Sequence, residues 1–167
     1  MSSSQVPFGW QELIDHDVGV RVGHPSHTVS GAPIRVARTV RPESGLHLSS
    51  ADQSVYVELV RLPGMTLDIE YRLHRRRLER RFGPDSVSDV EPGTLSGYEC
   101  AVYSFNTREL RRVVTSIAVG DDIVRVVVDP SSQLNNEIMA RIAVDPDDFH
   151  DSTAARRADI EEGPSPG

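Results

Sequence analysis

The side chains best suited to bind a metal ion lie near the amino end of the sequence. His16, His24 and His27 fall within twelve residues, and Asp15 and Asp17 flank the first of them. Three imidazoles and a carboxylate are a chemically sound ligand set for zinc. Their spacing matches no known zinc motif, however, and the second and third histidines stand in a predicted loop. We therefore expect solvent-exposed histidines and no metal site.

Side chains that could act as nucleophiles or bases are few. No serine stands in a G-x-S-x-G turn, no glycine-rich phosphate-binding motif occurs, and a chain without lysine cannot form a Schiff base. Cys100 lies within a predicted strand with no basic neighbour to activate it, which predicts a buried, inert thiol. His74 is predicted to be a core residue of a helix. We expect no catalytic residue and no cofactor, while a small-ligand pocket or an unrecognised enzyme stays open as an alternative.

The strongest positive signal is an arginine-rich stretch, Arg72–Arg81, which holds six arginines and one glutamate in ten residues. On a helix with Leu73 and Leu78 packed inward, four guanidinium groups spread over the exposed arc: those of Arg72, Arg75, Arg76 and Arg80. Guanidinium groups bind carboxylates and phosphates through paired hydrogen bonds. We predict a partner-binding surface here, with an acidic protein segment as the preferred partner. Nucleic-acid or phosphate binding is the alternative, and a solvated helix face is the simplest interpretation.

The charge of the chain is concentrated at its carboxyl end. Of the formal net charge of -7, residues 145–167 contribute -5 through seven acidic residues and two arginines. This stretch has few apolar side chains to bury, so we predict a disordered acidic tail. Residues 1–7 are predicted to be a flexible start, and residues 8–144 a single domain. The nearly neutral domain argues against non-specific nucleic-acid binding, which needs a basic surface.

Alternating apolar residues predict a domain rich in strands. Valine and isoleucine together number 29, against 11 leucines, a composition weighted towards β-structure. Strands are expected at 18–22, 34–41, 46–48, 55–60, 98–105, 113–119 and 123–128. The last two are joined by a tight turn at Gly120-Asp121-Asp122. The final strand is apolar on both faces, which predicts a central strand covered from both sides.

Two longer segments have helical periodicity. The first runs from Leu67 to Phe82, with Thr66 as its N-cap and Gly83-Pro84 as its stop. The second runs from about Ser132 to Ala143, and a short helix is expected around Trp10–Ile14. The order of elements predicts an α+β fold, a mostly antiparallel β-sheet with helices on both faces.

Three stretches of the sequence resemble the PsbP-like superfamily. Val18-Gly-Val-Arg-Val-Gly-His-Pro25 is similar to the first strand of that family, which ends at a proline. Leu95-Ser-Gly-Tyr98 is similar to its mid-domain glycine, which leads into a long strand. The hairpin from Val113 to Val128, followed by a helix to Val144, resembles the elements that close these domains.

The resemblance covers residues 8–144 and carries an implied function. The superfamily includes the photosystem protein PsbP, a Ran-binding import factor, actinobacterial lipoproteins and cytosolic effector chaperones, and it has no shared catalytic apparatus. It therefore implies a PsbP-like, non-enzymatic adaptor or chaperone-like module that binds an exported or assembled protein and could form a homodimer. One departure is that Ser26-His27 follows Pro25, where many members have an aromatic residue. The resemblance supplies no site residues.

Three features of the sequence bear on location. The first residues lack the basic and apolar regions of a secretory signal. No apolar run approaches the ~20 residues of a membrane span, and Cys100 has no second cysteine with which to pair. We expect a cytoplasmic protein with no membrane partner. The use of eighteen arginines and no lysine is typical of a GC-rich, bacterial genome.

Overall fold

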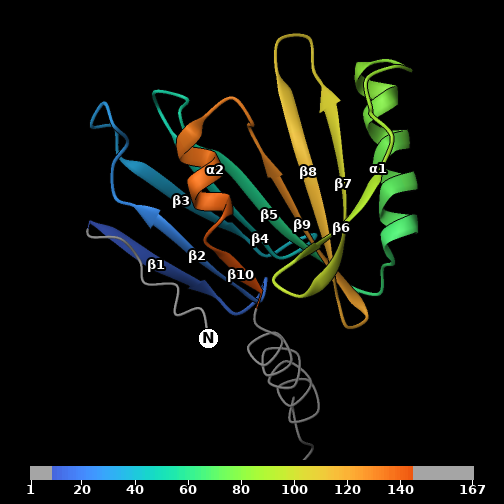
Figure 1. Cartoon of the computed structure of the whole chain (residues 1–167), viewed down its shortest axis with the longest axis horizontal. Helices are drawn as coiled ribbons and strands as arrows, with labels where there is room; N and C mark the ends of the chain where they lie inside the picture. Colours follow the sequence, from blue (N-terminus) through green and yellow to red (C-terminus); the bar gives the residue numbers. More distant parts are fainter. Residues whose placement is uncertain (1–8, 145–167) are drawn as a thin grey trace, which may run out of the picture.

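A computed structural model describes residues 9–144 of the chain. The predicted flexible start and the predicted acidic tail, residues 1–7 and 145–167, lie outside the described residues. Within residues 9–144 the chain forms two antiparallel sheets and two helices, which confirms the predicted α+β class (Figure 1). The elements are β1 (Trp10–Asp15), β2 (Val20–Pro25), β3 (Ile34–Thr39), β4 (Gly45–Ser50), β5 (Tyr56–Leu62), α1 (Leu67–Phe82), β6 (Glu91–Leu95), β7 (Tyr98–Asn106), β8 (Arg111–Val119), β9 (Asp122–Val128), α2 (Gln133–Met139) and β10 (Ile142–Val144).

The large sheet has the strand order β3-β4-β5-β9-β8-β7-β6, and each neighbouring pair is antiparallel. Strand β9 lies in its centre, as its two apolar faces predict. Val126 of β9 lies opposite Leu59 on one side and Thr115 on the other. Val127 points to the opposite face and packs in a different cluster from Val126. Both faces of the sheet are therefore covered at its centre.

One face of the large sheet, here called the α2 face, is covered by α2 and by the small sheet β1-β2-β10. Its core joins Val20 and Val22 of β2 to Leu59 and Val126 of the large sheet and to Ile138 of α2. Each of these side chains is at most 1% exposed. Burial of several valine, leucine and isoleucine side chains is worth roughly 1.5–3 kcal/mol each, so this cluster is the main source of stability.

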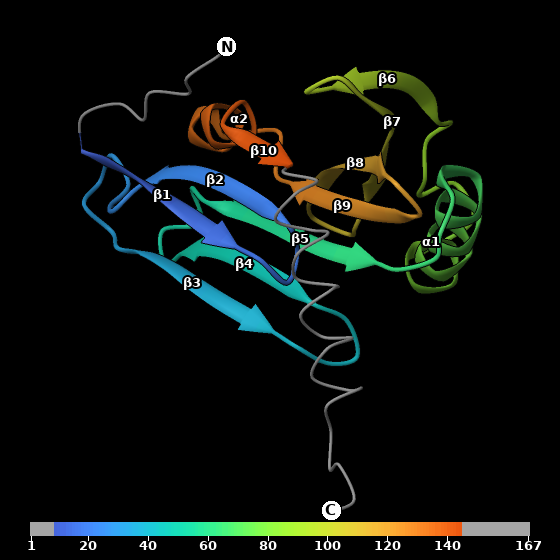
Figure 2. The same ribbon diagram turned by 90° about the horizontal axis from the view of Figure 1, so that it is seen from below.

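The opposite face, here called the α1 face, is covered by α1 over β7 and β8. Helix α1 has the predicted bounds because its ends carry strong local signals. The Thr66 hydroxyl accepts a hydrogen bond from the Ile69 amide, and Gly83 at φ 112° closes the last turn. Figures 1 and 2 show α1 beside β7 and β8, and α2 beside β2 and β5. Within the described residues, one helix lies on each face, as the sequence predicts.

Three sequence predictions about the elements are wrong or incomplete. Residues 10–14 belong to strand β1, because they pair with β2 along their whole length and no helix forms there. The second helix ends at Met139, since Ile142 and Val144 are drawn into strand β10 beside β2. Strand β6, residues 91–95, was not predicted. Its own sequence has a weak β-propensity, and hydrogen bonding to β7 stabilises it as a strand.

Candidate docking surfaces

The four arginines predicted to bind a partner all lie on α1. Arg72 forms an ion pair with Asp68 at 3.3 Å, and Arg75 with Glu79 at 2.7 Å. Arg76 and Arg80 are exposed, and neither makes an ion pair with another residue of the range 9–144. Half of the predicted set is thus engaged in pairs within the helix, and half is available to a partner.

The apolar side chains of α1 are arranged differently from the prediction. Leu78 is buried as expected, but Leu73 is 49% exposed and Ile69 is 40% exposed. The two lie one helical turn apart, on the same outward side as Arg76 and Arg80. Leu73 points away from the core because the inward positions are taken by Tyr71, His74 and Leu78. The outer surface of α1 is therefore mixed, with an apolar centre and arginines towards its carboxyl end.

A hydrogen-bonded polar cluster lies beneath α1. The Tyr103 hydroxyl donates to Oε1 of Glu70 at 2.7 Å, and Nδ1 of His74 lies 2.6 Å from the same hydroxyl. Because the hydroxyl proton is directed at Glu70, Nδ1 of a neutral His74 carries the hydrogen and donates. Arg125 adds a contact from Nη1 to Oε1 of Glu70 at 3.3 Å. These contacts join α1 to β7 and β9.

The electrostatics of this cluster keep His74 neutral. Burial, reinforced by the positive charges of Arg125 and Arg77, lowers the pKa of His74 from 6.5 to about 3. Glu70 lies 3.6 Å from Nδ1, but its attraction does not offset the loss of solvation. Burial and the Glu70 charge also raise the pKa of Tyr103 well above its usual range. A histidine with so low a pKa is a poor base at neutral pH. The cluster instead holds α1 against β7 and β9 through its hydrogen bonds.

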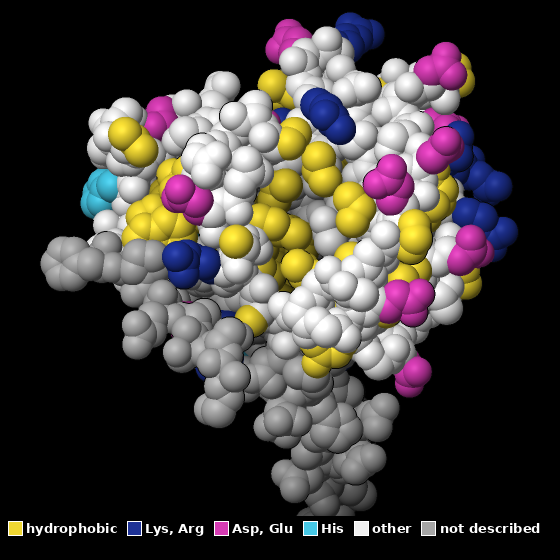
Figure 3. All heavy atoms as spheres, viewed as in Figure 1, with side chains coloured by type: hydrophobic (Ala, Val, Ile, Leu, Met, Phe, Trp, Pro, Cys, Tyr) yellow, Lys and Arg dark blue, Asp and Glu magenta, His cyan; other side chains and the backbone are white. Residues whose placement is uncertain are grey.

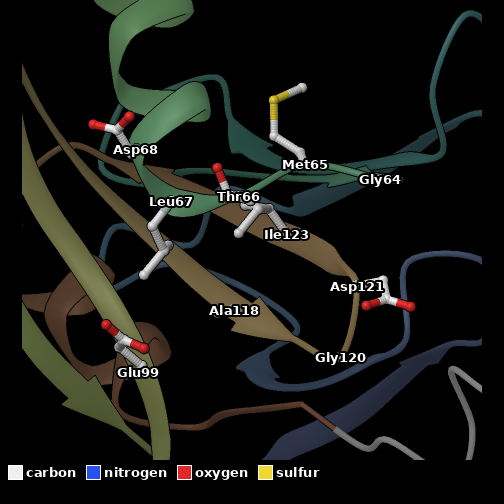
Figure 4. Close-up of a pocket in the computed structure, with 10 residues that line it drawn as sticks. All are labelled: Gly64, Met65, Thr66, Leu67, Asp68, Glu99, Ala118, Gly120, Asp121 and Ile123. Carbon is white, nitrogen blue, oxygen red and sulfur yellow. The ribbon is translucent and has the colours of Figure 1, made fainter.

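A pocket of about 620 Å³ opens at the amino end of α1 (Figure 4). Its apolar lining includes the half-buried Met65, Leu67 and Ala118. Figure 4 shows the carboxylates of Glu99 and Asp121 on opposite sides of the pocket. Asp68 adds a third carboxylate, and no arginine is among the lining residues, which are Gly64, Met65, Thr66, Leu67, Asp68, Glu99, Ala118, Gly120, Asp121 and Ile123. The chemistry of this acid-rimmed pocket suits a cation on an aliphatic stem.

Elements far apart in the sequence build the acid-rimmed pocket. One wall is the loop from β5 into α1, another is β7 and β8, and the turn between β8 and β9 closes the third side. The loop is held in place because the Gly64 amide donates to Oδ1 of Asp122 at 3.0 Å. Asp121 lies in the predicted turn, while Glu99 carries no sequence signal of a binding role. No local pattern marks these residues, because only the sheet register brings them together.

A second hollow lies on the α2 face, between α2 and strands β6, β7 and β8. Figure 3 shows hydrophobic side chains gathered in this hollow in the middle of the molecule. These elements contribute half-buried apolar side chains that pack against the core: Leu95, Tyr98, Val102, Val113, Leu134 and Met139. Helix α2 is only seven residues long, and its main contacts are with β2 and β5.

A pocket of about 270 Å³, here called the outer pocket, shares Val102 and Val113 with this set of apolar side chains. Val102 and Val113 lie on its floor, while Asp89, Glu91 and Arg111 supply charged groups at its rim. An apolar floor with a polar rim is the usual composition of a surface that binds another molecule.

The histidines and the cysteine singled out from the sequence lie elsewhere. His24 is 1% exposed and belongs to strand β2, which corrects the prediction of an exposed loop; its Nδ1 lies 2.8 Å from the carbonyl oxygen of Pro25. His16 and His27 are exposed. In the described part of the chain no three metal-ligating side chains come together. Cys100 is buried as predicted, and burial raises the pKa of its thiol.

No protein-family model matches the chain, and no curated protein matches it in sequence. Neither helix of the described residues has the length and apolar character needed to cross a membrane.

Proposed function

We propose that this protein is a non-enzymatic, protein-binding module, an adaptor or chaperone-like accessory protein that holds an apolar segment of its partner. The observation that carries the proposal is the apolar hollow on the α2 face (Figure 3). The strands and the helix around the hollow, β6, β7, β8 and α2, contribute six half-buried apolar side chains that pack against the core. Exposure of apolar surface to water is unfavourable, and its free energy falls when an apolar group of a partner covers it.

The surroundings of the hollow indicate what kind of segment it holds. Its floor is β-sheet, its walls are α2 and β6, and its outer pocket is bordered by Glu91 and Arg111. Charged groups of both signs at the rim favour a segment with polar flanks around an apolar centre. The resemblance of residues 8–144 to the PsbP-like superfamily, whose members act with other proteins, supports the same kind of function by analogy.

Capture of the partner with matched variants tests this proposal. The tagged chain is incubated with nuclease-treated extract of its native host at moderate salt, and bound proteins are quantified by mass spectrometry. Leu95→Gln and Val102→Thr place polar groups in the hollow, and we expect each to lower the recovery of a partner at least about tenfold, a loss of roughly 1.4 kcal/mol. Leu110→Gln is the matched control, because Leu110 is 48% exposed in the turn between β7 and β8.

Equal recovery with the hollow variants and the control would overturn the proposal. Thermal unfolding of each variant is measured as well, and binding is compared only between variants that are folded at the temperature of the capture. Salt dependence separates the alternative function, binding of nucleic acid or phosphate through Arg76 and Arg80. Phosphate contacts weaken steeply between about 50 and about 200 mM salt, whereas burial of apolar surface does not. The capture is therefore repeated from extract that has not been treated with nuclease. Recovery of nucleic acid that falls steeply with salt, and that Arg80→Glu abolishes, would favour the alternative.

We propose the cytoplasm as the setting of this function. The thiol of the one cysteine, Cys100, is buried in β7. A lone buried thiol is compatible with a reducing compartment, because it has no second cysteine in the chain with which an oxidising compartment could form a disulfide.

A further inference from the structure

The outer surface of α1 and the acid-rimmed pocket lie at one edge of the molecule and carry opposite charges. The pocket at the amino end of the helix presents the carboxylates of Glu99 and Asp121. The carboxyl half of the helix presents exposed arginines, of which Arg76 and Arg80 make no ion pair within residues 9–144. Figure 3 shows arginine side chains gathered over α1, with acidic side chains beside them. The same surface is therefore acidic at one end and basic at the other.

We propose that the acid-rimmed pocket is a guanidinium-binding site, and that its occupant is Arg80 of a second copy of this chain. Two copies of α1 would lie antiparallel across a two-fold axis, so that each helix inserts Arg80 into the pocket of the other. A two-fold interface is self-complementary, and a surface with opposite charges at its two ends meets that requirement. The proposal is independent of the apolar hollow, which lies on the α2 face.

The spacing along α1 fits this arrangement. Leu73 is the most exposed apolar residue of the helix at 49%, so apolar contact is greatest when the axis passes beside it. Arg80 is seven residues further on, or about 10.5 Å along the helix axis. Seven residues before Leu73 is Thr66, which lines the pocket. An antiparallel partner helix centred on Leu73 therefore brings its Arg80 level with the mouth of the pocket.

The choice of Arg80 follows from the pairs already present on α1. Arg72 and Arg75 are held by Asp68 and Glu79. Arg76 lies near the centre of the proposed contact, where its aliphatic stem can cover the partner's apolar centre. Arg80 points outward within the last turn and reaches beyond that centre. The pocket offers what its side chain needs, since the half-buried Leu67 can contact an aliphatic stem and the exposed Asp121 can bind a guanidinium.

The size of the contact predicts a weak, salt-sensitive dimer. Helix α1 has 16 residues and is about 24 Å long. A single pair of helices of this length buries less than the roughly 1,200 Å² of a stable complex. Much of the attraction comes from exposed charges, which salt screens beyond about 8–10 Å. Dimers should thus form at high protein concentration and low salt, and dissociate as salt rises.

A charge exchange between two variants of the full chain tests the proposal. Sedimentation velocity at low salt should show a dimer of the unaltered chain. Arg80→Glu alone and Asp121→Arg alone each place like charges in both contacts, and each should weaken dimerisation at least about tenfold. An equimolar mixture of the two variants should restore it, because every contact in the mixed dimer again joins opposite charges. Arg35→Glu, an exposed arginine on β3, is the matched control and should leave dimerisation unchanged.

Covalent trapping gives a second measurement of the same geometry. Leu73→Cys lies on the proposed axis, and mild oxidation should link two copies through it, whereas Val36→Cys on β3 should not link. The native Cys100 is buried and should not react. A chain that stays monomeric at the highest attainable concentration, a mixture of variants that does not recover, or an absence of Leu73→Cys cross-linking would overturn the proposal.

Discussion

Arg61 clamps Asp122 through two N–H groups directed at one carboxylate oxygen. Nη2 and Nε of Arg61 lie 2.8 and 3.1 Å from Oδ2 of Asp122, and the arginine side chain is only 7% exposed. Nη1 also donates to the carbonyl oxygen of Asp17 at 3.3 Å. The other oxygen of Asp122 accepts the amide of Gly64. One ion pair therefore joins β5, β9, the small sheet and the loop that lines the acid-rimmed pocket.

Removing the charge of Asp122 should destabilise the whole chain. Asp122→Asn removes the carboxylate charge that pairs with the buried Arg61 guanidinium, and breaking such a pair costs about 3 kcal/mol. Urea denaturation should show a free energy of unfolding lower by that amount. Asp121→Asn is the matched control, because Asp121 is exposed in the same turn; we expect a change of at most about 0.5 kcal/mol. Equal effects of the two substitutions would show that the clamp contributes little.

Acid should destabilise the protein through His74. Its pKa is about 3 in the folded chain, against 6.5 in the unfolded one, so the unfolded chain binds the extra proton between these values. The free energy of unfolding therefore falls as pH drops below 6.5, by about 2 kcal/mol at pH 5 from this residue alone. His74→Asn keeps a donor near Tyr103 and cannot be protonated.

The measurement for His74 is urea denaturation of the unaltered chain and of His74→Asn at about pH 7 and about pH 5. The loss of stability between the two pH values should be about 2 kcal/mol smaller in the variant. His27→Asn, at an exposed histidine, serves as the control and should leave the loss unchanged. If the variant and the unaltered chain lose the same amount, His74 does not carry the effect.

Asp52 should stay ionised in acid that protonates an ordinary aspartate. Its two carboxylate oxygens accept hydrogen bonds from four hydroxyl groups at 2.6–2.8 Å, those of Thr28, Ser30, Ser50 and Ser54. These bonds lower the pKa of Asp52 far below 3.8, the Ser30 bond contributing most. Stability from this group is therefore present above pH 3.8 and is lost only as pH falls well below it.

A carbon-detected NMR titration of the Asp52 carboxyl tests this expectation, with Asp52→Asn used to assign the signal. The carboxyl shift should not reach its midpoint by about pH 3. Asp52→Asn should also speed amide hydrogen exchange at Thr28, whose loop the carboxylate ties to β4. A midpoint near 3.8 would show that the hydroxyl groups do not bind the ionised form in solution.

Some elements of this protein could be predicted from sequence because their signals are local. Helix α1 has a capping threonine at one end and Gly83-Pro84 at the other, so its bounds follow from hydrogen bonds within a few residues. Strand β9 is apolar on both faces, which is compatible only with a covered central position. The exposure of Arg76 and Arg80 follows from helical periodicity.

Other features were decided by tertiary structure, because they depend on partners distant in the chain. Residues of β1 and β10 form strands because they hydrogen-bond to β2, and this pairing outweighs their weak local secondary-structure preferences. The predicted inward position of Leu73 is wrong, because the contacts of α1 with the sheet are made by Tyr71, His74 and Leu78. The acid-rimmed pocket joins Thr66, Glu99 and Asp121 from three separate stretches. Composition and local pattern therefore determined the elements of this protein, while sheet register and helix placement decided which side chains meet at its surfaces.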